Sequence, residues 1–192
     1  MAKVKFGLSN LKVFPRENNG TVTYKEGIAI PGAVSLTLEK EVSEAIFYAD
    51  NTVYYSNKLS NGFTGEMEVA DLPKEVMLAL LDYAEATEGG ILQTNKAGVP
   101  CALGFSVDTD EAARKFMLYN VTLSETSEEF ATKEDEVEPT TSKLEFRCIG
   151  EVAKDGTTTV FKHVCNKGDK NYETFLTTAP TIPTVKVVGA VG

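Results

Sequence analysis

The sequence predicts a mainly β protein, built as an antiparallel β-sandwich or barrel with one flanking α-helix and long loops or arms. Three features predict this class: apolar residues that alternate with polar ones, one segment with helical spacing, and polar runs between the ordered segments. The 192 residues, of which 42% are hydrophobic, suffice for one domain with a single core. We expect a β-domain over residues 1–165 and a C-terminal arm over residues 166–192.

Alternation with a period of two is clearest in residues 34–39 and 63–69. One face of each segment is apolar or small, and it consists of Val34, Leu36, Leu38, Phe63, Gly65, Met67 and Val69. The other face is polar and ends in carboxylates, and it consists of Ser35, Thr37, Glu39, Thr64, Glu66 and Glu68. This pattern is typical of a sheet with one buried and one wet face. Further strands are predicted at residues 3–6, 11–14, 45–48, 52–55, 102–107, 116–123, 143–149 and 158–164.

The predicted helix covers about residues 73–84. Asp71 is a candidate cap, and Pro73 suits the first helical turn. An apolar stripe follows at spacings of three and four, formed by Val76, Met77, Leu80, Leu81 and Ala84. Gly89 and Gly90 are predicted to end the helix.

Two polar stretches follow the predicted strands. The run from Ser124 to Ser142 is rich in acidic residues and indicates either a solvated loop or an arm that orders against a neighbouring subunit. The tail after Asn166 has a similar character, but its apolar residues Tyr172, Phe175 and Leu176 would be unfavourable in water, which favours docking. Pro180 and Pro183 argue against a central strand there.

Charge and targeting signals exclude several classes of protein. The chain has 28 acidic and 19 basic residues and a formal charge of −9. It therefore lacks the basic surface that binds nucleic-acid phosphates. Three widely spaced cysteines, Cys101, Cys148 and Cys165, indicate free buried thiols in a reducing compartment. No apolar run indicates a signal peptide or a membrane span, so we expect a soluble protein that is made in cytoplasm.

Residues for catalysis or metal binding do not form a convincing set. His163 and Cys165 share one strand face, but two ligands without further partners do not make a zinc site. The stretch from Asp108 resembles the start of a calcium loop, yet Ala113 and Tyr119 stand where glycine and glutamate are required. Carboxylate pairs of the glycosidase kind stay open, because 28 acids permit many spatial pairs. We expect no enzyme, no metal and no cofactor.

Aromatic residues concentrate in a predicted hairpin that lacks histidine, cysteine and arginine. They are Phe47, Tyr48, Tyr54, Tyr55 and Phe63. Core packing is one interpretation for Phe47 and Phe63, and recognition of a partner is the other. Because Tyr54 and Tyr55 are sequential, a strand directs them to opposite faces, so one of the two is expected to leave the core of its own chain.

Five short blocks carry a resemblance to a known family. They are IPGAVSLTLE at Ile30, FYADNTVYY at Phe47, GFTGEMEVADLP at Gly62, LYNVT at Leu118 and TKEDEVEP at Thr132. In this order and at these spacings, they resemble the major tail protein family of bacteriophages with long, non-contractile tails. The similarity covers about residues 3–152, and the part after Ala153 matches less well.

The resemblance implies a tail tube protein of the virion, with a β-sandwich-like subunit that forms stacked hexameric rings after synthesis in the host cytoplasm. It implies no catalytic residues, and as partners further copies of the chain, a tape-measure protein, tail terminator and tip proteins, and DNA that passes without specific binding. Combined with the aromatic pattern, it predicts subunit or ring contacts at Phe47, Tyr48, Tyr54, Tyr55, Phe63, Tyr172 and Phe175. The alternation predicts acids that face the lumen at Glu39, Glu66 and Glu68.

Two further interpretations stay open. A small-ligand or carbohydrate-binding β-sandwich would also use exposed tyrosines and acidic loops, and it would be a monomer with a groove. A tube from a phage-derived injection device or a type VI-like secretion machine would use the same ring.

Overall fold

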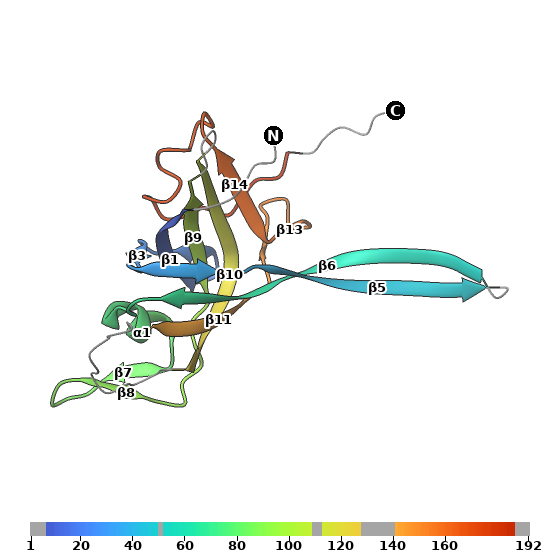
Figure 1. Ribbon diagram of the computed structural model, residues 1–192. Helices are drawn as coiled ribbons and strands as arrows, with labels where there is room; N and C mark the ends of the chain where they lie inside the picture. Colours follow the sequence, from blue (N-terminus) through green and yellow to red (C-terminus); the bar gives the residue numbers. More distant parts are fainter. Residues whose placement is uncertain (1–6, 50–51, 109–112, 128–140, 187–192) are drawn as a thin grey trace, which may run out of the picture.

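The computed structural model, shown in Figure 1, describes residues 7–49, 52–108, 113–127 and 141–186. Its main feature is a curled antiparallel sheet of ten strands, from which one long hairpin leads away (Figure 1). One helix and two small two-stranded sheets complete the described fold. The predicted mainly β class with a single helix is confirmed.

The main sheet runs in the order β2, β1, β9, β10, β11, β6, β4, with β3 added to β1, β14 to β10 and β5 to β6. Its strands are β1 (Leu8–Asn18), β2 (Val22–Tyr24), β3 (Ile28–Ala29), β4 (Ala33–Leu36), β5 (Glu39–Ala49), β6 (Thr52–Val69), β9 (Cys101–Val107), β10 (Arg114–Ser127), β11 (Ser142–Cys148) and β14 (Lys162–Asn166). The small sheets pair β7 (Tyr83–Glu85) with β8 (Ile91–Gln93), and β12 (Glu151–Val152) with β13 (Thr159–Val160).

The chain between β3 and β4 brings the two ends of the sheet together. Ile30 N–H donates to the Leu11 carbonyl on β1, and Ala70 N–H, just after β6, donates to the Gly32 carbonyl. Because β1 and β6 lie near opposite ends of the strand order, these bonds hold the sheet in a barrel-like curl. Curling encloses the apolar face that the alternation predicts.

Apolar side chains occupy both faces of the central strands. The larger cluster lies inside the curl and includes Val13, Met67, Val76, Leu103, Leu118 and Leu144, all almost fully buried. The second cluster lies on the other face and joins Phe14, Met117 and Tyr119 to Phe175 and Leu176 of the C-terminal segment. Phe175 and Leu176, which were expected to dock, are thus buried against the β-domain of the same chain.

An ion-paired network fixes the β12–β13 sheet to the edge of the main sheet. Glu151 on β12 is 7% exposed and accepts two hydrogen bonds from Arg16, at 2.7 and 3.1 Å, and one from the Tyr24 hydroxyl at 3.2 Å. Burial and the Glu151 carboxylate raise the pKa of Tyr24, so the phenol stays a donor. The bidentate geometry satisfies both carboxylate oxygens of a buried acid.

Helix α1 (Lys74–Leu80) is shorter than the predicted 73–84, and Pro73 rather than Asp71 holds the N-cap position. Leu81 is already extended, because the Leu80 carbonyl accepts from Val99 N–H instead of from a further helical turn. The Asp82 carbonyl likewise accepts from Thr94 N–H. Ala84 therefore lies in β7, and Gly89 and Gly90 belong to the β7–β8 turn instead of ending the helix.

Other predicted boundaries also change. The hairpin is longer than the segment Phe47 to Phe63 that was predicted, since β5 and β6 together span Glu39 to Val69. Residues 124–127 of the predicted polar loop belong to β10, whereas its residues 128–140 lie outside the described part, as do the predicted strand 3–6 and residues 187–192. The predicted strand 158–164 is divided between β13 and β14.

The Gly62→Ala change tests the close approach of β6 to β11. Gly62 has φ +133°, and a Cβ at this position would overlap the backbone carbonyl oxygen of Cys148. We expect the substitution to lower the free energy of unfolding by about 2 kcal/mol or more, measured by urea denaturation. Gly20→Ala is the control, because Gly20 also has positive φ (+85°) but open space around it. Equal losses in both variants would contradict the steric argument.

Candidate assembly interface

The β5–β6 hairpin is the element of the described chain that leads away from the body (Figure 1). Its ladder runs from the pair Glu39–Thr64 to the pair Ala49–Thr52, and Figure 1 shows the ribbon leading away from the body. In the described residues, 52–62 of β6 pair with β5 alone, and β5 pairs with β6 alone. Within the part of the chain that the structure describes, both outer edges of the ribbon therefore lack ladder partners. A two-stranded ribbon of this kind is marginally stable in water, and open edges favour pairing with another chain.

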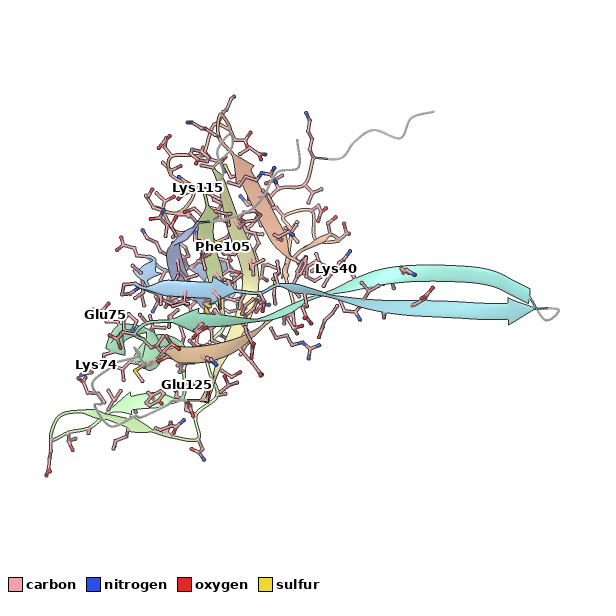
Figure 2. All side chains as sticks on the ribbon, in the orientation of Figure 1. Lys40, Lys74, Glu75, Phe105, Lys115 and Glu125 are labelled. Carbon is pink, nitrogen blue, oxygen red and sulfur yellow. The ribbon has the colours of Figure 1, made fainter. Side chains whose placement is uncertain are left out.

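The shaft of the hairpin is mainly polar, although Val42 and Leu59 on it are 50% and 57% exposed. Glu44 and Lys58 form an ion pair of 3.6 Å, and the Ser43 hydroxyl donates to Asn61 at 3.2 Å across the strands. Lys40 lies where the ribbon leaves the body (Figure 2). The polar residues of the shaft are therefore compatible with solvent.

The predicted aromatic contact residues of the hairpin gather near its tip. Phe47 on β5 is paired with Tyr55 on β6, and Tyr48 is paired with Val53. Tyr54 lies between these two pairs on β6. The structure thus brings four of the predicted residues together, and their role in contacts stays a prediction.

The other three predicted contact residues lie on the body. Phe63 is half-buried, with its ring edge-on to Phe161 at 6.4 Å between centroids. Lys115 Nζ lies 4.2 Å from the ring centroid of Tyr172, and burial, together with the Glu173 carboxylate, raises the pKa of Tyr172. Phe175 is 9% exposed and has little surface left for a neighbour in this conformation.

His163 and Cys165 serve the packing of the C-terminal segment. The His163 ring lies edge-on to Phe175 at 4.8 Å, and its Nδ1 is 3.5 Å from the Tyr119 hydroxyl. Burial lowers the pKa of His163 and raises that of Tyr119 to about 12. Within the described residues, no group of three or more metal-ligating side chains could hold an ion.

The predicted acids lie on the outward face of β5, β6 and β11. Glu66 and Glu39 are exposed and Glu68 is half-buried, while Met67 and Val69 between and beyond them are buried in the core. The alternation in β6 is therefore as predicted. Glu68 accepts a hydrogen bond of 2.5 Å from the Thr141 hydroxyl.

The sheet adds acids to this face that the sequence analysis missed. Glu145 on β11 stands directly opposite Glu66, and Glu41 pairs with Arg147 at 3.1 Å. Glu145 could have been flagged by alternation in residues 143–149, but only the strand order places it beside Glu66. Glu39, Glu66 and Glu145 border an open groove of about 670 Å³, which is also lined by Arg147, Thr37, Thr64, Thr122 and Ser124.

The chain was compared with models of known protein families and with curated proteins. No model of a known protein family matches the chain, and no curated protein matches it. Across the described residues, no helix has the length and apolar character needed to cross a membrane.

The Glu66–Glu145 pair generates a test of the outward face. Like charges that are directly opposite on neighbouring strands are destabilising, so Glu145→Lys should raise the free energy of unfolding by roughly 0.2–1 kcal/mol at low salt. The gain should shrink at 1 M salt, where the screening length falls to about 3 Å. Glu88→Lys, in the exposed β7–β8 turn, is the control for net charge. An equal gain in both variants would contradict a local effect.

Proposed function

We propose that this chain is a structural virion protein that assembles into stacked hexameric rings, which form a phage tail tube and the channel for DNA delivery. The observation that carries the proposal is the β5–β6 hairpin, which leads away from the body with both edges unpaired in the described residues. Pairing or packing on neighbouring copies removes such edges from solvent. The ring symmetry and the phage identity rest on the sequence resemblance.

The hairpin supports an assembly that propagates. A tip that binds to a different surface of the next copy makes a heterologous contact, and such contacts produce rings or filaments rather than closed dimers. The body supports the same proposal, because in the described residues its sheet has further strands with a ladder on one side only, such as β2 and β14. In the proposed ring, neighbouring subunits complete these sheets.

The outward acidic face supports a role as a channel wall. Glu39, Glu66 and Glu68 would repel phosphates over the ~8 Å screening length of physiological salt, so that DNA does not adhere. Six copies at −9 each would give a ring with a formal charge of about −54. The proposed partners are further copies, a tape-measure protein, tail terminator and tip proteins, and passing DNA. The proposed location is the virion, with assembly in the host cytoplasm.

Removing the tyrosines at the hairpin tip tests the ring-to-ring contact. The double variant Tyr54→Ala, Tyr55→Ala should remain folded but fail to form tubes, because interface aromatics contribute about 2 kcal/mol or more each. Negative-stain microscopy over a concentration series measures the tubes, and circular dichroism measures the fold. Tubes of normal length would refute the assignment of the tip. A chain that stays monomeric at every concentration, with a small molecule in a groove, would favour the ligand-binding alternative.

Reversing the charge of the outward face tests the channel wall. Glu66→Lys, Glu68→Lys should leave tube assembly intact but slow DNA release from particles that contain the variant, because lysines attract phosphates. Single-particle fluorescence of released DNA measures the rate, and added salt should restore part of it. Glu75→Lys, Glu88→Lys, which lie away from this face, form the control with equal net charge. Release at the unmodified rate in the first variant would exclude this face from the lumen.

A further inference from the structure

An apolar groove of about 450 Å³ is bordered by β4 and by residues of β1, β9 and β10. Phe105 and Phe116 line it, with rings stacked at 5.1 Å between centroids, and both belong to the main core. Figure 2 shows Phe105 in the middle of the body. Leu8 and Leu36 lie on the sides of the groove, and Val34 is 56% exposed beside it. The groove thus borders residues of the main core.

Strand β4 gives this groove an unpaired backbone edge. In the described residues, β4 has a ladder with β6 and with no other strand. An open strand edge next to an apolar groove is the arrangement to which extended chain binds, since backbone hydrogen bonds and alternate side chains are both accommodated. The groove and the β4 edge together therefore suit an extended strand or a two-stranded ribbon from another segment or another copy of the chain.

We propose that this groove receives the tip of the β5–β6 hairpin from a second copy of the chain. The inference rests on the proposed function, and it assigns the surface on which the proposed ring-to-ring contact is made. The aromatic residues near the tip fill the apolar groove, and one open edge of the ribbon lies along β4.

Charge favours the hairpin tip over the N-terminal residues of the chain as the occupant of the groove. Residues 45–57 contain one charged residue, Asp50, and Lys162 is the one charged residue among those that line the groove. Residues 1–6 instead carry Lys3 and Lys5, which Lys162 would repel. The hairpin is thus the electrostatically complementary occupant.

The occupant comes from a second copy because the ribbon leads away from its own body (Figure 1). From Glu41 to Ala49 the ribbon extends roughly 30 Å, at about 3.4 Å per residue. Tip and groove are different surfaces of the same chain, so the contact runs head to tail and continues from copy to copy.

Val34→Asp is the first test. Val34 is more than half exposed, so the change should leave the fold intact, whereas the buried contact would lose an apolar neighbour and gain a charge next to the acidic tip. We expect the protein concentration needed for tube formation, measured by light scattering, to rise at least tenfold. Leu92→Asp is the matched control, because Leu92 is equally exposed (56%) on the separate β7–β8 hairpin. Equal effects in the two variants would overturn the proposal.

Crosslinking gives a readout that does not depend on the stability of a variant. Phe47 is replaced by the photoreactive residue p-benzoylphenylalanine in the full chain, and assembled tubes are irradiated and analysed by mass spectrometry. Crosslinks to residues 33–38, 105–107 or 116 of another copy support the proposal. Crosslinks elsewhere in tubes that still form would overturn it and leave the proposed function standing.

Two further outcomes separate the possible failures. If deletion of residues 2–6 abolishes tubes and the Phe47 probe does not reach the groove, the N-terminal segment is the occupant and the proposal is wrong. If the unmodified chain forms no polymer at any concentration, the proposed function fails and the inference fails with it.

Discussion

The continuous hydrogen bonding of β6 is the constraint on which the rest of the structure depends. Its residues 63–69 pair with β11 inside the body, and its residues 52–62 pair with β5 in the hairpin. Met67 and Val69 anchor the inner half, since both are almost fully buried in the main core. One continuous strand of 18 residues therefore belongs to both the core and the hairpin, and it fixes the hairpin to the core without a separate hinge. The ribbon is marginal alone, but its root is as stable as the body.

The body provides a stable root for the hairpin because it buries both faces of its central strands. The inner face is covered by the curl of the sheet and by α1, and the outer face of β9 and β10 is covered by the C-terminal segment with Phe175 and Leu176. The outward face of β6 and β11 is different, because it carries Glu66, Glu145 and Thr64 and has no apolar cover in the described residues. One sheet thus has a covered region and an acidic uncovered region. That division is what distinguishes this fold from a sandwich built only to enclose its core.

The sequence predicted what depends on local pattern. Alternation around Met67 and Glu66 gave the strand, its buried face and its wet face, because a period of two is decided by neighbours along the chain. It did not predict the end of the helix, because Val99 and Thr94 donate to carbonyls near Leu80, and these partners are distant in sequence.

Residues 56–62 were missed as strand for a similar reason. They lack apolar alternation, and their extended conformation follows from pairing with β5. The sequence also grouped Phe63 with the tip aromatics. The structure instead places Phe63 beside Phe161 at the root of the hairpin, because β6 is long enough to belong to both regions. Likewise Glu145 could be assigned to a wet face, but only the strand order makes it the neighbour of Glu66.

The direction of the hairpin is set at the point where it leaves the body. The register between β5 and β6 shifts between Glu41 and Val42, opposite Gly62, whose φ of +133° is unfavourable for other residues. Such irregularities bend and twist a ribbon locally, and they re-aim the chain beyond them. A head-to-tail contact forms only if the tip arrives at the correct angle, so a few backbone torsions at Gly62 would determine how successive copies are oriented. The same glycine also permits β6 to approach the Cys148 carbonyl on β11, which fixes these torsions to the core. In the proposed assembly, core packing and the orientation of successive copies would therefore be coupled through Gly62.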